Sequence, residues 1–345
     1  SFAAQARDAA PIQPVSKSPR ALMAEPAFIE AFANFVHERH RGFRVPNQWS
    51  ARDPSELNDS GVRVRITVRN ARLLDPPPTL DTYGFQLVVA PTDLDLLDQA
   101  AVRGPFYQEC RDVLKAATGC AEVRGGSHEY RNGFGGRPQT DPRGARPTPS
   151  GSAGAYATGI HSDMSAAVEG SLARVVPDER HFESINIWRS TGPHRNIDMM
   201  PLALCDMRSV RPEDVVFGDG VNTGNVKQFY KVVDQKIVHD PSQRWYYFPN
   251  MTPREVLIFR QYDTRQEALN LRTVFHTAVE DPTSPRDAPL RSTIEVRMQA
   301  IYGRETNKAD RVARFRAEIS GRYADGRACD WFSGPIENYQ PPARL

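Results

Sequence analysis

Long hydrophobic runs and a charge excess of either sign are both missing from this 345-residue chain. No apolar stretch approaches the roughly 20 residues that a membrane-spanning helix needs, so we expect no membrane partner. The 44 basic and 42 acidic residues nearly balance, and no basic cluster stands out, which argues against a nucleic-acid partner. Residues 1–21 lack the continuous apolar core of a secretory signal, and we expect residues 1–25 to be a disordered lead-in.

Cysteine is also scarce, and no pair of cysteines is spaced for a zinc site. The sequence has only Cys110, Cys120, Cys205 and Cys329, and none of them forms a CxxC pair. In a chain of this length, isolated cysteines are typical of a reducing compartment, and we predict a cytoplasmic location. We interpret all four as structural thiols.

What the sequence does contain is a long series of short strand-like segments, separated by Pro, Gly, Asn or Asp. From residue 184 onward they lie at residues 184–190, 201–207, 228–233, 243–249, 255–262 and 290–302. Earlier strands are expected at residues 62–72, 82–90 and 121–133. The pattern predicts a mainly β chain, an antiparallel sandwich or barrel, with flanking helices.

Three segments have helical features instead. Residues 26–40 have the spacing of an amphipathic helix in their apolar side chains, Phe28, Ala31, Phe32, Phe35 and Val36. We expect His37 and His40 to be exposed at its end. Residues 91–119 predict one or two helices, from a cap at Thr92 to a stop at Gly119. Residues 308–320 predict a C-terminal helix packed on the barrel.

These segments predict one domain over residues 26–345. Its parts are a helix-and-strand N-terminal part (26–131), a loop (132–159), a barrel core (160–305) and a C-terminal helical part (306–345). The loop is rich in Gly, Pro, Ser, Thr and Arg, and loops of such length are usually either disordered or functional. Because it runs directly into His161, we expect this loop to be a functional lid that covers a pocket and not a disordered segment.

The stretch GIHSDMS places His161 and Asp163 one residue apart. Alternate side chains at the end of a strand point the same way, so both could bind one ion. Two histidines and one carboxylate can occupy one face of a ferrous ion and leave three positions for a co-substrate, oxygen or water. The alternative is a hydrogen-bonded loop pair without a metal.

A third ligand must come from another strand, and the downstream candidates are His181, His194, His239 and His276. His276 is the best of them because it lies in the short apolar stretch TVFHTAVED. Its alternative is a core histidine bonded to backbone groups. His194 and His239 lie in turn-like polar segments, where we expect them to be exposed.

Arg291 follows His276 by 15 positions (291 − 276) in the segment LRSTIEVR. On an extended strand, Arg291, Thr293, Glu295 and Arg297 face one side. A guanidinium fork and a hydroxyl two residues apart make a good carboxylate clamp, as the distal carboxylate of 2-oxoglutarate would need. Arg297 shares the face and competes with Arg291 for this role, while an ion pair within the strand is the structural alternative.

An ordered set of motifs resembles the gibberellin-desaturase-like and cephamycin-methoxylase-like hydroxylase/desaturase family. The motifs fall within residues 60 to 305 and read YGFQLVVAPTDL, YQECRDVLKAATG, HEYRNG, HSDMS, INIWR, PLALCDMRSV, YFPNMTPREVLIFRQYD, FHTAV and RSTIEVR. The resemblance implies a double-stranded β-helix (a jelly-roll, cupin-like core) and a non-haem Fe(II), 2-oxoglutarate-dependent dioxygenase. It also implies His161, Asp163 and His276 as iron ligands and the Arg291 strand as the co-substrate site.

Members of that family often tailor secondary metabolites, so the resemblance implies a small organic substrate and O2, with hydroxylation, desaturation and ring closure all open. Candidate substrate residues are Asn186, Trp188, Arg189 and Tyr247, with Asn186 and Trp188 on one strand face and Arg189 on the other. Two alternatives remain: a facial-triad iron enzyme that does not use 2-oxoglutarate, and a non-catalytic ligand-binding barrel. The oligomeric state is not readable.

Overall fold

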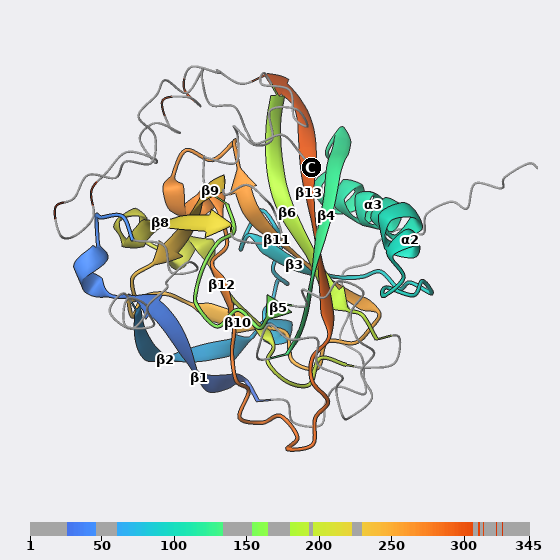
Figure 1. The fold of residues 1–345 in the computed structure, drawn as a ribbon, viewed down its shortest axis with the longest axis horizontal. Coiled ribbons are helices and arrows are strands. Elements are labelled where there is room, and N and C mark those ends of the chain that lie inside the picture. Colours follow the sequence, from blue (N-terminus) through green and yellow to red (C-terminus); the bar gives the residue numbers. More distant parts are fainter. Residues whose placement is uncertain are drawn as a thin grey trace, which may run out of the picture.

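The computed structural model describes residues 26–45, 61–133, 154–164, 180–192, 196–222 and 230–305, with the single positions 310, 313, 322 and 326. Its fold is mainly β, as expected, and two large sheets face each other (Figure 1). Among the described residues, no helix is long and apolar enough to cross a membrane.

The larger sheet has six strands in the order β3-β11-β6-β13-β4-β5. In that order they span Phe85–Val89, Glu255–Asp263, Arg180–Ser190, Thr293–Glu305, Glu122–Gly133 and Gly154–Ala155. All of its neighbours are antiparallel except β4 and β5.

The smaller sheet has five strands in the order β1-β2-β10-β7-β12, which span Phe28–Val36, Gly61–Asn70, Trp245–Tyr247, Leu202–Cys205 and His276–Ala278. A separate hairpin pairs β8 (Val215–Asn222) with β9 (Tyr230–Ile237). Short 3-10 turns connect these strands, η2 (Glu38–His40), η3 (Ala71–Leu73), η5 (Met207–Ser209), η6 (Pro212–Asp214) and η7 (Leu269–Arg272).

Side-chain alternation divides the larger sheet into an outer and an inner face. On the outer face, Ile187 and Val296 share one buried apolar cluster with Phe106 and Leu114 of the helical segment. That segment runs from α2 (Gln99–Ala101) through the π-helical turn η4 (Val102–Phe106) into α3 (Tyr107–Thr118), which lies beside β4 (Figure 1).

The inner face meets the smaller sheet. A second apolar cluster joins Trp188 and Phe259 of the larger sheet to Leu204 and Tyr246 of the smaller one. The space between the two sheets is therefore where inner-face polar side chains can gather at a site.

The expected helix at residues 26–40 is wrong, because Phe28–Val36 is strand β1, paired with β2. Its buried side chains alternate, with Ile29, Ala31 and Ala33 inside, while Phe32 is half exposed. Two large aromatic residues on the solvent side produced the helical spacing. His40, expected at the surface, is buried.

The other helical predictions have mixed outcomes. Gly119 does end α3, in the left-handed conformation (φ 62°), and donates its N–H to the carbonyl of Lys115. Thr92 caps only a turn at Leu94, and the helix begins after Asp98, whose side chain accepts from the N–H of Ala100. The structure describes only positions 310 and 313 of the predicted helix at 308–320, and most of the predicted lid lies outside the described residues.

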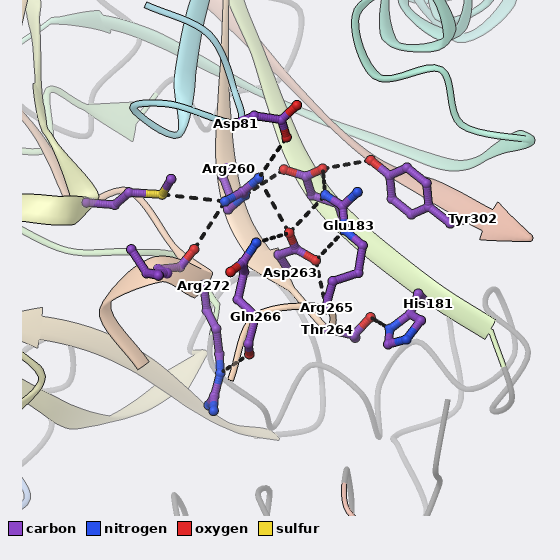
Figure 2. Close-up of polar contacts among 12 residues, drawn as sticks. Asp81, His181, Glu183, Arg260, Asp263, Thr264, Arg265, Gln266, Arg272 and Tyr302 are labelled. Atoms are coloured by element: carbon purple, nitrogen blue, oxygen red, sulfur yellow. Dashed lines mark hydrogen bonds and ion pairs between the residues drawn. The ribbon is translucent and has the colours of Figure 1, made fainter. Parts of the chain in front are cut away.

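A buried ion-pair network crosses the ends of β6 and β11 (Figure 2). Arg260 donates to Glu183 at 2.6 Å and pairs with Asp263 at 3.4 Å, and all three side chains are at most 1 % exposed. Arg265 and Tyr302 complete the network, since each bonds Glu183, at 2.9 and 2.8 Å respectively. Mutual pairing of these charges is what allows them to be buried.

The described cysteines agree with a structural role. Cys110, Cys120 and Cys205 are free and buried. Burial raises the pKa of Cys110 to about 12, so this thiol is a poor nucleophile at neutral pH. Cys329 lies outside the described residues.

Candidate metal centre

The backbone brings His161 and His276 to the same place. They exchange two hydrogen bonds, from the N–H of His161 to the carbonyl of His276 at 3.2 Å and in the reverse direction at 3.0 Å. Residues paired in this way point their side chains to one side, and the two ring centroids are 4.5 Å apart. Asp163 follows two residues after His161, and one ligand atom from each of the three residues lies within 4.8 Å of the others.

Each imidazole is oriented by its own backbone. Nδ1 of His161 bonds the carbonyl of Gly159 at 2.8 Å, and Nδ1 of His276 bonds that of Val274 at 3.2 Å. This leaves Nε2 of both rings for a metal. Burial, with help from His276, lowers the pKa of His161 to about 3, which keeps its imidazole in the neutral form that binds metals.

Asp163 is held by three neighbours, two at its carboxylate and one at its backbone N–H. Asn186 donates to Oδ2 at 2.9 Å, Arg297 pairs with the same oxygen at 3.4 Å, and the N–H of Asp163 donates to Gln261 at 2.9 Å. Burial favours the neutral acid, but the Arg297 guanidinium and both histidines hold the pKa of Asp163 below its usual range. Two imidazoles and one carboxylate are a donor set that fits ferrous iron.

Arg291 lies buried between aromatic rings. Its guanidinium carbon is 4.4 Å from the ring centroid of Tyr156 and 5.4 Å from that of Trp188, and Nη1 donates to the carbonyl of Met200. Among the described residues, Nε has no partner and no acidic side chain pairs with Arg291. Burial lowers the pKa of Arg291 to about 10, so the guanidinium stays charged at neutral pH and lacks a counter-anion there.

Arg297 differs from Arg291 because its charge is already paired. It lies 2.8 Å from Glu295 and 3.4 Å from Asp163. Thr293 is buried at the start of β13, where its hydroxyl bonds the carbonyl of Arg131 at 3.4 Å. Arg291, two residues before β13, therefore has no acidic partner among the described residues, whereas Arg297 within β13 is paired.

The four predicted substrate residues do not all lie on the face that carries the triad. Asn186 and Trp188 lie on the inner face, beside Asp163 and Arg291 respectively. Arg189 points to the outer face, away from the triad, where it donates to the carbonyl of Ala90 at 2.9 Å.

Tyr247 does not point to the site either. It is buried with Trp245 in a cluster on the other side of its sheet, while Tyr246 packs with Trp188 and Phe259. Side chains alternate along the three-residue strand β10, so Tyr246 faces one side while Trp245 and Tyr247 face the other. Every residue of the run WYYF is aromatic, so the sequence does not show which of them face the site.

The other candidate histidines stay away from the triad. His181 bonds Thr264 at 3.1 Å, and His239 packs edge-on against Phe35 at 5.0 Å. His194 lies outside the described residues. Sequence reasoning missed Gln261 and Tyr156, whose positions beside Asp163 and Arg291 depend on contacts between distant segments.

Comparison with known proteins gives one family and several relatives. The family model described as "Oxidoreductase/YMDC permease-like domain" matches residues 34–301. The chain is 29% identical over 252 residues to the hydroxylase/desaturase efuI of Hormonema carpetanum, which covers 69% of this chain and 83% of efuI. It is 25% identical over 238 residues to the Fe(II)/2-oxoglutarate-dependent dioxygenase nvfI of Aspergillus novofumigatus, covering 65% of this chain and 78% of nvfI.

A solved structure supports the architecture. The iron and alpha-ketoglutarate-dependent endoperoxidase NvfI superposes with a TM-score of 0.62 at 23% identity, over 81% of this chain and 99% of that one. At this identity the likeness establishes the fold, so the double-stranded β-helix expectation is confirmed.

Proposed function

The chain belongs to the family described as an oxidoreductase/YMDC permease-like domain, and from this premise we propose that it is a non-haem Fe(II), 2-oxoglutarate-dependent oxygenase of a small organic substrate. The observation that carries the proposal is the pairing of a buried His-Asp-His cluster with a buried arginine that has no acidic partner among the described residues. Relatives named hydroxylase/desaturase and Fe(II)/2-oxoglutarate-dependent dioxygenase support it.

His161, Asp163 and His276 would hold the iron through two Nε2 atoms and one carboxylate oxygen. Iron, when bound with 2-oxoglutarate and O2, supplies oxidation coupled to decarboxylation of the co-substrate to succinate. The contribution of the chain is rigid placement. The histidines are fixed by backbone carbonyls, and Phe259 packs edge-on against His276 at 4.8 Å.

Arg291 would bind the distal carboxylate of 2-oxoglutarate. A planar guanidinium can give a carboxylate two parallel hydrogen bonds, and Tyr156 and Trp188 restrict it to one plane. The hydroxyl of Thr293, two residues on, would add a donor by giving up its bond to the carbonyl of Arg131. Burial strengthens the pair of Arg291 and the co-substrate carboxylate, because water competes less for the carboxylate.

The reaction type within this class is open to hydroxylation, desaturation or ring closure, as the varied names of the relatives indicate. Trp188 and Asn186 are the inner-face side chains best placed to border the substrate. A cytoplasmic location belongs to the same proposal, and the free buried thiols support it.

Succinate formation tests the proposal. Purified protein would be incubated with Fe(II), ascorbate, 2-oxoglutarate and candidate secondary metabolites, and succinate measured against a reaction without iron. We expect iron-dependent succinate formation that increases with a true substrate. Wild-type protein that neither binds iron nor consumes 2-oxoglutarate would overturn the proposal, while product formation without 2-oxoglutarate would favour an iron enzyme that takes electrons from its substrate.

A further inference from the structure

The two carboxylate oxygens of Asp163 lie in different surroundings. Oδ1 is 3.5 Å from Nε2 of His161, one of the proposed ligand atoms. Oδ2 accepts a hydrogen bond from Asn186 at 2.9 Å and lies 3.4 Å from Nη2 of Arg297. One carboxylate oxygen therefore lies beside the proposed ligand His161, and the other contacts Asn186 and Arg297 of the larger sheet.

We propose that Asn186 and Arg297 are positioning residues that reserve Oδ2 of Asp163, so that Oδ1 alone faces the metal. Glu295 acts with them by aligning the guanidinium of Arg297. The inference rests on the proposed function, and it gives Arg297 a role distinct from the co-substrate clamp at Arg291.

Strand register places the two donors side by side. Arg297 of β13 and Asn186 of β6 are direct cross-strand partners, and Phe259 of β11 is the next partner in the same row. Directly opposed residues share a face and keep a fixed separation. The row therefore presents an amide and a guanidinium to Asp163, and an aromatic ring to His276.

Glu295 explains why Arg297 stays with Asp163. It lies two residues earlier on the same face, and it accepts from Nε of Arg297 at 3.0 Å and lies 2.8 Å from Nη2. Both contacts are to Oε1 of Glu295, so two nitrogens of the guanidinium are held by one oxygen. With Nε and Nη2 engaged, Arg297 is not a free anion site, whereas Arg291 has no acidic partner in the described part of the chain.

The main chain gives a further anchor. Oε1 of Gln261 accepts the N–H of Asp163, so the residue is held at its backbone as well as at Oδ2. A carboxylate fixed in this way binds a metal through one oxygen. That matters because a facial triad must leave three positions open, and a second carboxylate oxygen would occupy one of them.

Metal affinity without co-substrate or turnover tests the inference. Metal-free wild type, Asn186→Leu and Arg297→Met would be titrated anaerobically with Co(II) by calorimetry, with the Co(II) visible spectrum as a second readout. Loss of a side chain that orients a metal ligand typically weakens binding ten- to a hundredfold, and we expect that loss in both variants. The spectra should change as well, because a carboxylate free to rotate alters the coordination.

The matched control is Gln299→Met. Gln299 lies on the same face of β13, one alternation beyond Arg297, and its amide bonds Ser184 at 3.4 Å without contacting Asp163. The substitution Gln299→Met removes a buried polar side chain from the same strand, so it measures how much a polar-to-apolar change in β13 alone alters Co(II) affinity. We expect its Co(II) affinity to stay within about twofold of wild type, the scatter usual for independent sites.

A double-mutant cycle separates alignment from burial effects. Arg297→Met leaves Glu295 without its partner, so Glu295→Gln and the double variant are needed alongside it. If Glu295 acts through Arg297, Glu295→Gln alone weakens Co(II) binding and adds nothing to Arg297→Met. Arg297→Lys, which restores the charge, should recover part of the affinity.

The outcomes separate the two levels of the proposal. Failure of the wild type to bind Co(II) or Fe(II) would remove the proposed function and this inference together. Tight binding by the wild type with equal affinity and spectrum in folded Asn186→Leu and Arg297→Met would overturn only the inference. Equal losses in Gln299→Met would overturn it too, because the effect would then belong to the strand and not to Asp163.

Discussion

At the scale of single residues, the metal centre depends on three side chains, the one group in the described part of the chain that could hold a metal ion. We expect His276→Ala and His161→Ala to abolish iron binding at micromolar metal while the fold survives, because a three-ligand site that loses one ligand is severely weakened. Asp163→Ala should behave nearly the same way. Anaerobic Fe(II) titration with circular dichroism checks this, and tight iron binding by folded His276→Ala would remove it from the ligand set.

Arg291 gives the second prediction at this scale. Arg291→Lys keeps the charge but loses the planar two-point donor and its stacking against Tyr156. A charge-assisted hydrogen bond contributes about 1.5–3 kcal/mol, so the apparent constant for 2-oxoglutarate should rise about ten- to a hundredfold. The measurement is co-substrate titration at saturating iron, and iron affinity should hardly change.

Arg297→Lys is the control for that experiment. At saturating iron it should leave the co-substrate constant near that of wild type, because Arg297 serves Asp163 and Glu295. A large co-substrate defect in Arg297→Lys and none in Arg291→Lys would exchange the two roles.

The sequence could place both arginines on one face but could not choose between them. Alternation along a strand is a local property, and it correctly put Arg291 and Arg297 inside. What distinguishes them comes from other segments, since Asp163 reaches Arg297 while Tyr156 and Trp188 enclose Arg291. Spacing along the sequence predicts to which side of the strand each arginine side chain points. The groups that each guanidinium contacts come from distant segments and are known only from the fold.

At the scale of elements, strands with clear alternation were predictable and β1 was not. The inward and outward faces of β6 and β13 follow directly from their sequences, and Gly119 correctly ended α3. In β1 two large aromatic residues, Phe28 and Phe32, face solvent, so the apolar spacing followed a helix. Tertiary pairing with β2 overrides that local pattern.

The ion-pair network between β6 and β11 carries a stability prediction. Arg260→Met would leave Glu183 and Asp263 buried beside each other without their central cation (Figure 2). Breaking a buried pair from one side typically destabilises a protein by about 3–5 kcal/mol. Urea unfolding of the two proteins should show a loss of that size.

Arg265→Met is the matched control, because Arg265 also pairs with Glu183 and Asp263 but its side chain is 30% exposed. Water can replace much of its contribution, so the loss should be clearly smaller. Equal losses in the two variants would show that burial does not set the energetics of this network.

At the scale of the whole molecule, the site exists because the fold brings together residues that are far apart in the sequence. His161 and His276 are 115 positions apart (276 − 161) and meet as a single backbone bridge. Arg297 belongs to the larger sheet and Arg291 lies two residues before its strand β13, while His276 belongs to the smaller sheet. The metal centre therefore lies where the sheets meet, and its assembly should be coupled to folding of both.

That coupling gives the last prediction. A ligand that binds only the folded protein stabilises it by about 2.7 kcal/mol at 100 times its dissociation constant, which raises the melting temperature by roughly 3–5 °C in a chain of 345 residues. We expect anaerobic Fe(II) or Co(II) to raise the melting temperature of wild type, and 2-oxoglutarate to raise it further only when metal is present. His276→Ala should lose both increments, whereas Arg291→Lys should keep the first and lose most of the second. Scanning calorimetry with and without each ligand measures them separately, and a 2-oxoglutarate increment that persists in metal-free protein would show that the co-substrate binds apart from the triad.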